Sequence, residues 1–282
     1  MQIRCPAQYI EIVGESNLRL PPLPEIFRSS SVLLTKEYDI LVVMNDHRPI
    51  ENTCYKFVNG EWKVQNPPQN FLLVDTQGFT MQNGYYLLSP TGGNSTILPN
   101  DQNEWTLGPY YDFYFSSGDM AKLVATSNTE IVGTGGTEVP SRIFKINVIT
   151  QEIKEIGNLL NGRWSHSSAF FNGKVIVTGG GGNNANPNFS TSTSTEVIDL
   201  ESGLSRIVGD LNTNRRSHGM GIVTKNGKPT LIVFGGEFSK AGHEISHDSI
   251  EEWDDQTETW RISNLKLNIG RHEFKWCSLQ HF

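Results

Sequence analysis

Short apolar runs that end in paired glycines recur along the chain. Val175-Ile176-Val177-Thr178 runs into Gly179-Gly180, and Leu231-Ile232-Val233-Phe234 runs into Gly235-Gly236. A third pair stands at Gly135-Gly136. The runs have the length of buried strands, and no helical periodicity extends them. The pattern predicts short strands joined by turns, and therefore an all-β fold.

An Arg opens each copy of this pattern. Arg163, Arg215 and Arg271 are separated by roughly 50 residues, which is the period of the kelch unit. Trp62, Trp105 and Trp260 stand where the fourth strand of a unit is expected. On these residues the chain resembles the kelch family of β-propellers. The resemblance implies four-stranded blades packed face to face, in which the Gly pairs and Trp residues serve the fold.

Counting the copies predicts a six-bladed kelch-type β-propeller that forms one domain over residues 1–282. Its last blade is expected to be closed by both termini, which would remove a free sheet edge. The predicted blades are residues 27–66, 71–108, 113–159, 163–211, 215–265, and 271–282 together with 1–24. This last blade lacks a Gly pair, as do the first two blades, which have Met44-Asn45 and Ser89-Pro90 in its place.

Charge and composition limit the classes of partner and compartment. The 282 residues carry a formal net charge of −7, which disfavours nucleic acid as a partner because phosphate binding needs a basic face. No apolar run is long enough to cross a bilayer, and the first residues lack the regions of a signal peptide. Three cysteines are too few for a disulfide scaffold. We therefore expect a cytoplasmic monomer without membrane contact, and secretion is left open.

One end of the predicted propeller gathers arginine and aromatic residues. Because strand direction alternates in a blade, the loops between second and third strands and the loops between blades lie at the same end. Arginine and aromatic residues are enriched in binding hot spots. The predicted partner-binding residues are Arg28, Arg48, Tyr110, Tyr111, Arg142, Arg163, Trp164, Arg215, Arg216 and Arg271. The alternative for each Arg is a structural role, in which it binds backbone carbonyls and fixes a loop.

No catalytic constellation stands out from the repeats. His166, His218 and His272 are interpreted as equivalent repeat positions that serve packing or loop bonding. The loop from Gly242 to Asp248 contains metal-ligand residue types, but we expect a solvated loop and no metal site. We predict no cofactor and no enzymatic activity.

Two functional classes follow from the resemblance. The first is a protein-interaction module or scaffold that binds a protein or peptide on the arginine-rich face. Since guanidinium groups bind carboxylates bidentately, that partner could be an acidic peptide segment. The alternative is an enzyme or small-ligand binder that uses the central channel of the propeller.

Overall fold

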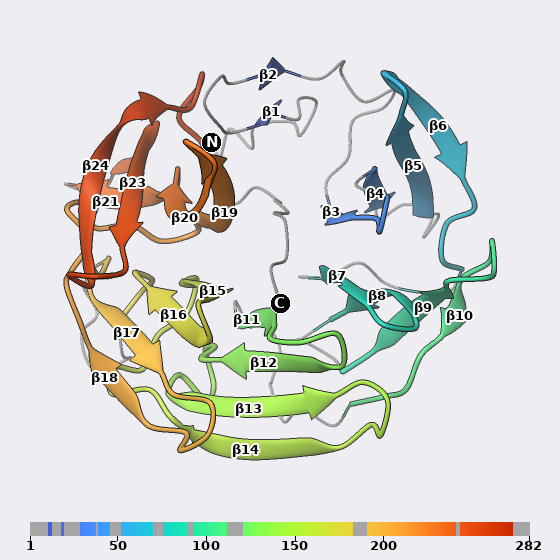
Figure 1. The fold of residues 1–282 in the computed structure, drawn as a ribbon, viewed down its shortest axis with the longest axis horizontal. Coiled ribbons are helices and arrows are strands. Elements are labelled where there is room, and N and C mark those ends of the chain that lie inside the picture. Colours follow the sequence, from blue (N-terminus) through green and yellow to red (C-terminus); the bar gives the residue numbers. More distant parts are fainter. Residues whose placement is uncertain are drawn as a thin grey trace. The chain divides into compact units, whose positions relative to one another are not determined.

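The structure is a computed structural model that describes residues 11–12, 18–19, 29–37, 39–45, 52–69, 71, 76–89, 93–111, 121–182, 191–240 and 243–272. Over these residues the chain forms strands and no helix (Figure 1). The chain divides into two compact units, residues 1–114 with 275–278 and residues 115–274 with 279–282. Each unit is built from antiparallel sheets, so the prediction of an all-β fold is confirmed.

The first unit contains two four-stranded meanders and one short strand pair. The first meander runs through β3 (Ser29–Leu34), β4 (Ile40–Asn45), β5 (Asn52–Val58) and β6 (Glu61–Gln65). The second runs through β7 (Gln77–Met81), β8 (Gly84–Leu88), β9 (Ser95–Pro99) and β10 (Thr106–Leu107). The short pair is β1 (Glu11–Ile12) with β2 (Leu18–Arg19). Strands β3 and β7 contact one another, so the two meanders pack through their first strands.

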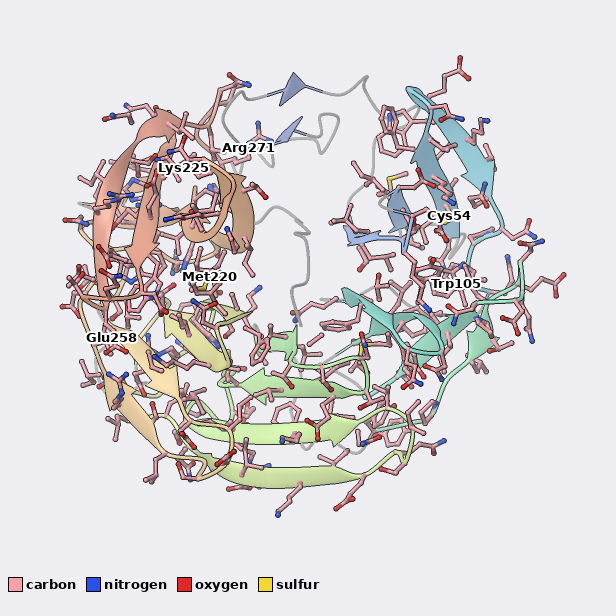
Figure 2. The ribbon with its side chains drawn as sticks, in the orientation of Figure 1. Cys54, Trp105, Met220, Lys225, Glu258 and Arg271 are labelled. Atoms are coloured by element: carbon pink, nitrogen blue, oxygen red, sulfur yellow. The ribbon has the colours of Figure 1, made fainter. Side chains whose placement is uncertain are left out.

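A buried apolar cluster joins these two meanders. Cys54 lies within it, and Trp105 packs against the cluster (Figure 2). Burial raises the pKa of the Cys54 thiol to about 12. Since the thiolate is the reactive form, Cys54 is a packing residue. Cys5 and Cys277, which the predicted sixth blade would place on neighbouring strands, lie outside the described residues.

The second unit contains three four-stranded meanders and a hairpin. The β11–β14 sheet consists of β11 (Lys122–Ala125), β12 (Glu130–Thr134), β13 (Arg142–Asn147) and β14 (Ile153–Asn158). The β15–β18 sheet consists of β15 (Ser167–Phe171), β16 (Lys174–Thr178), β17 (Thr195–Ile198) and β18 (Ser205–Ile207). The β19–β24 sheet consists of β19 (Gly219–Lys225), β20 (Lys228–Phe234), β23 (Ser249–Asp254) and β24 (Thr259–Lys266). The hairpin of β21 (Glu237–Lys240) and β22 (His243–Ser246) is inserted between β20 and β23.

Neighbouring sheets of the second unit bury their faces against each other. Val132 and Ile143 of the β11–β14 sheet share one apolar cluster with Val175, Val177 and Ile198 of the β15–β18 sheet. Each of these five side chains is fully buried. The second strand of each sheet is buried on both faces. Its sequence is therefore a continuous apolar run instead of an alternation of apolar and polar residues. The first strands β11, β15 and β19 contact one another in that order.

The pairs Gly135-Gly136 and Gly179-Gly180 each lie where two neighbouring sheets of the second unit cross. Gly179 and Gly180 have φ of 62° and 94°, values that favour glycine. The Gly180 N–H donates to the Arg215 carbonyl at 2.9 Å, which ties one sheet to the loop that leads into the next. A Cβ on Gly180 would come within 2.7 Å of the Trp164 carbonyl oxygen. Gly179 and Gly180 therefore serve the fold, as the resemblance implies.

Over the described residues the structure forms five four-stranded blades, where the repeat count predicts six over the whole sequence. Each four-stranded sheet falls within one predicted span, except that β24 continues to Lys266, one residue beyond 215–265. Most of the residues assigned to the sixth blade lie outside the described part of the chain. Closure of a sixth blade by both termini therefore stays a prediction, as does a single domain over residues 1–282.

Candidate functional site

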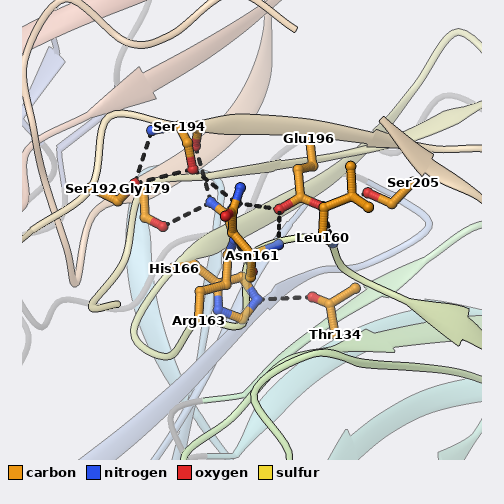
Figure 3. Close-up of polar contacts among 10 residues, drawn as sticks. All are labelled: Thr134, Leu160, Asn161, Arg163, His166, Gly179, Ser192, Ser194, Glu196 and Ser205. Atoms are coloured by element: carbon orange, nitrogen blue, oxygen red, sulfur yellow. Dashed lines mark hydrogen bonds and ion pairs between the residues drawn. The ribbon is translucent and has the colours of Figure 1, made fainter. Parts of the chain in front are cut away.

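A buried arginine anchors the loop that leads into the β15–β18 sheet. Arg163 is only 1% exposed, and its Nη2 atom lies 2.6 Å from Glu196 Oε1 (Figure 3). Its Nη1 atom donates to the carbonyls of Gly179 and Ser194, each at 3.0 Å. The guanidinium therefore joins the end of β16 to the start of β17.

The partner carboxylate holds the same loop from the other side. Glu196 accepts the backbone N–H groups of Leu160 at 2.7 Å and Asn161 at 2.9 Å, and the Ser205 hydroxyl at 2.5 Å. Burial acts to raise the pKa of Glu196, but the Ser205 hydrogen bond and the charge of Arg163 outweigh it and lower the pKa. A buried charge pair of this kind fixes the loop, because every oxygen has a partner.

The β19–β24 sheet repeats this arrangement. Arg215 Nη2 lies 2.8 Å from Glu251 Oε1, and both side chains are fully buried. Its Nη1 atom donates to the Gly235 carbonyl at 2.8 Å. Glu251 accepts the backbone N–H groups of Asn212 and Thr213 at 2.7 and 3.1 Å. The lead-in loops of two successive sheets are thus held by the same set of contacts.

Two buried histidines also recur at equivalent places. His166 Nε2 lies 2.9 Å from Thr134 Oγ1, and His218 Nε2 lies 3.0 Å from Thr178 Oγ1, in each case on the preceding sheet. Burial lowers the pKa of both imidazoles well below their usual value, so both are neutral. The interpretation of His272 as their equivalent is wrong, because it follows its Arg by one position and the others follow by three.

The residue directly after each lead-in Arg differs from sheet to sheet. Trp164 forms an antiparallel bridge with Gly181, and Arg216 forms the corresponding bridge with Glu237. His272 occupies the same place after Arg271. We call Trp164, Arg216, Glu237 and His272 the lead-in row.

Side chains of the lead-in row contact one another in sequence. The Arg216 guanidinium carbon lies 5.6 Å from the centroid of the Trp164 ring, within cation–π distance. Arg216 Nε donates to Glu237 Oε1 at 3.0 Å. His272 Nε2 lies 3.5 Å from Glu237 Oε2, and its Nδ1 lies 2.7 Å from the Ser246 hydroxyl. The row therefore combines an aromatic ring, a cation, a carboxylate and an imidazole.

The structure corrects three of the predicted contact residues. Arg163, Arg215 and Tyr111 are at most 1% exposed, so none can contact a partner on the surface of the folded chain. The two arginines form ion pairs with buried carboxylates, as expected if their role is structural. Burial raises the pKa of the Tyr111 hydroxyl above its usual range.

The remaining predicted residues differ in exposure. Tyr110 is 69% exposed in the first unit. Arg142 pairs with Glu155 at 3.1 Å and is 37% exposed, and Arg216 is mostly covered within the lead-in row. Trp164 and Arg271 are half-buried. Arg28 and Arg48 lie outside the described residues.

Sequence reasoning missed Glu196, Glu251, Glu237 and the position-specific role of His272. A signal for the first two was present, because each stands two residues after a Ser at the start of a third strand, in phase with the arginine repeat. Glu237 directly follows a Gly pair, where the preceding sheet has Gly181. Nothing in its local pattern marks it as buried.

Two classes of feature are absent from the described part of the chain. Over those residues, no three His, Cys, Asp or Glu side chains are grouped so that they could hold a metal ion. The same residues include no helix long and apolar enough to cross a membrane.

Comparison with known proteins supports the fold. The chain is similar to the solved structure described as "Structure of YjhT", with a TM-score of 0.66, 12% sequence identity and coverage of 88% of each chain. That likeness and the five meander sheets show an all-β β-propeller. No family model and no curated protein matches the sequence. Membership of the kelch family therefore stays a prediction.

Proposed function

We propose that this protein is a kelch-type propeller that acts as a protein-interaction module and binds a partner segment on the lead-in row. β-Propellers commonly act as interaction scaffolds, which supports the general class. One observation carries the proposal further. Equivalent positions of successive blades are identical where they hold the fold and different in the lead-in row, whose Trp164 and His272 are only partly buried.

Identical residues at equivalent positions have structural partners. Arg163 and Arg215 bind carbonyls and a buried Glu, and His166 and His218 bind the preceding blade. Their recurrence follows from the repeated backbone. They cannot determine which partner is recognised.

Different residues at equivalent positions are available for recognition. Trp164, Arg216 and His272 follow the lead-in Arg in three successive copies and share no side-chain chemistry. A scaffold that fixes the backbone and varies one partly buried loop position per blade can present a specific surface. Trp and Arg are also frequent in binding hot spots.

An acidic segment remains the partner chemistry that fits this face best. Arg271 lies at the lead-in position, and Arg142 begins a third strand at the same end of its blade. Arg216 adds a positive charge to the row, but its guanidinium is paired with the Glu237 carboxylate. Two of the arginines predicted to contact the partner, Arg163 and Arg215, do not contribute, because they are buried. Cytoplasmic location, a monomeric state and binding of protein instead of nucleic acid belong to the same proposal.

Quantitative affinity capture with matched variants tests the function. Arg271→Glu and Trp164→Ala should each remove the same partners that wild type retains. Lys154→Glu is the matched control, because it makes the same charge change on an exposed residue of β14, at the end of the strand away from the Gly pairs. Loss of the partners in the control as well would show that net charge, and not the row, controls binding.

Two outcomes separate the proposal from its alternative. Binding through exposed charges should weaken as salt rises, because screening acts on exposed pairs. Partners retained at full affinity by both Arg271→Glu and Trp164→Ala would overturn the proposal and favour a function in the central channel.

A further inference from the structure

Two exposed isoleucines lie on adjoining segments beside the lead-in row. Ile245 of β22 is 42% exposed, and Ile269, which stands two residues before Arg271, is 51% exposed. The two segments are in contact, because a Cβ on Gly270 would come within 3.0 Å of the Ser246 carbonyl oxygen. Large apolar side chains that stay exposed on adjoining segments are typical of an interaction surface.

The β21–β22 hairpin supplies one apolar face to this surface. Phe238 and Ile245 are register partners, so their side chains lie on the same face of the hairpin. The Phe238 ring stacks on His247, with ring centroids 4.9 Å apart and an angle of 20° between the planes. Glu237 and Ser246 are the neighbouring pair and lie on the opposite face. The polar face of the hairpin therefore contacts the lead-in row, and its apolar face presents Ile245.

The earlier lead-in loops are polar at the position of Ile269. Asn161 and Thr213 stand two residues before their lead-in arginines, as Ile269 does before Arg271. Both use their backbone N–H groups to bind the buried carboxylate of their blade, at 2.9 and 3.1 Å. A backbone contact requires no particular side chain, so the loop fold does not explain the isoleucine. Of the three lead-in loops in the described part of the chain, the one beside the hairpin is the one that carries an apolar residue here.

Arg271 places a guanidinium beside these apolar side chains. It is half-buried, and its Nε atom lies 3.4 Å from the Ile269 carbonyl oxygen. Hydrogen bonds from a guanidinium to a carboxylate are charge-assisted, and neighbouring apolar groups strengthen them by displacing water. A cation next to aliphatic side chains therefore fits a ligand that combines a carboxylate with a large apolar group.

We propose that the partner segment carries large apolar residues next to its carboxylates, and that one apolar side chain packs on Ile245 and Ile269 while a carboxylate binds Arg271. The inference rests on the proposed function, because it specifies the partner of the lead-in row. A purely acidic segment would leave both isoleucines exposed, and a purely apolar segment would leave the guanidinium without an anion.

Two labelled peptides of equal length and net charge are the probes for this preference. In one peptide Asp alternates with Leu, and in the other Asp alternates with Ser. Fluorescence anisotropy should show that the Asp–Leu peptide binds wild type roughly tenfold more tightly than the Asp–Ser peptide, as expected when an aliphatic side chain is partly buried.

Matched variants locate the preference on the surface. Ile269→Ser and Ile245→Ser should each reduce it, and a melting curve of each variant establishes that it is folded. Ile262→Ser is the control and should bind both peptides as wild type does, because it makes the same change on an isoleucine of β24 that is 63% exposed. Arg271→Glu should weaken the binding of both peptides, since both depend on a carboxylate contact.

Three outcomes would overturn the inference. The first is equal affinity of wild type for the two peptides, or binding of neither, and the second is an equal loss of preference in Ile262→Ser. The third is self-association of wild type, measured by sedimentation, that Ile269→Ser abolishes, because the occupant would then be a second copy of the chain.

The same measurements separate this inference from the proposed function. If both peptides bind equally and Arg271→Glu weakens both, the proposed function stands and the apolar preference fails. If the preference depends on Ile269 while Arg271→Glu and Trp164→Ala retain every partner that wild type captures, the proposed function fails and the apolar preference stands.

Discussion

The β11–β14 and β15–β18 blades share one topology but hold their third strands by different means. In the β15–β18 blade, Glu196 lies opposite Val177 and binds Arg163. At the equivalent place in the β11–β14 blade, Phe144 lies opposite Gly133. A Cβ on Gly133 would come within 1.9 Å of the Phe144 ring, so the ring occupies the space that a larger residue at 133 would need.

This difference indicates the role of the buried ion pair between Arg163 and Glu196. A blade packs well with an aromatic ring in place of the carboxylate, so the sheet itself does not require the pair. Glu196 makes contacts that a phenylalanine cannot make, with the Ser205 hydroxyl in its own sheet and with the backbone of Leu160 and Asn161 in the lead-in loop. The pair therefore serves to position that loop, and with it Trp164 of the lead-in row.

Removal of one partner from the pair should give the largest effect. Arg163→Ala leaves Glu196 buried without its counter-charge, and breaking such a pair costs about 3–5 kcal/mol in the free energy of unfolding. Chemical denaturation of wild type and variant measures the loss. Charge reversal at Arg163 or Arg215 would also disrupt the fold, because both residues are buried.

A double variant sharpens the comparison between the blades. Arg163→Met combined with Glu196→Leu removes both charges and places an apolar side chain where the β11–β14 blade has Phe144, so it should recover much of the lost stability. The loop amides of Leu160 and Asn161 would still lack their acceptor, so their hydrogen exchange should remain fast. A double variant as unstable as Arg163→Ala would show that the pair supports the sheet as well as the loop.

The fold was accessible from sequence because its signals are local. A Gly pair after an apolar run reports a backbone conformation, and the period of the arginines reports the blade. The chemistry of the site was less accessible. Arg163 and Arg215 recur because each is a buried structural residue, so their recurrence does not mark a binding face. His272 was aligned with His166, although it lies two positions earlier in its own repeat. Whether a guanidinium reaches solvent depends on a carboxylate more than 30 residues away, which the local pattern does not show.

A substitution in the Gly pair should lower stability by a similar amount in the β11–β14 and β15–β18 blades. A Cβ on Gly135 or Gly179 would come within 2.4 Å of the carbonyl of the next lead-in Arg. Both residues have positive φ, near 60°. Gly135→Val and Gly179→Val should each destabilise by about 2–4 kcal/mol through backbone strain and overpacking. Thermal melts test this, and an unchanged melting temperature in one blade would mean that its crossing is looser than the structure indicates.

The buried histidine contacts between successive blades should make the free energy of unfolding fall in mild acid. His166 and His218 have pKa values well below 6.5 in the folded state, so the unfolded chain binds protons first as pH falls. Their contribution is complete above about pH 6.5 and is lost below it, at up to about 1.4 kcal/mol per pH unit for each residue. Denaturation at several pH values measures this slope. His166→Gln should reduce it, and Glu196 cannot account for it because carboxylates titrate at lower pH.

Arg142 should show the smallest effect on stability and the clearest separation of the two kinds of arginine. It begins β13 at the position that Ser194 occupies before β17, since both carbonyls accept the first N–H of their Gly pair. Its partner Glu155 is 52% exposed, and pairs of this kind contribute about 0–1 kcal/mol. Arg142→Ala should therefore leave the unfolding free energy within about 1 kcal/mol of wild type, while Arg163→Ala does not. If partner affinity falls in Arg142→Ala without a change in melting, the exposed arginine belongs to recognition. A large loss of stability would instead assign it to the scaffold with Arg163.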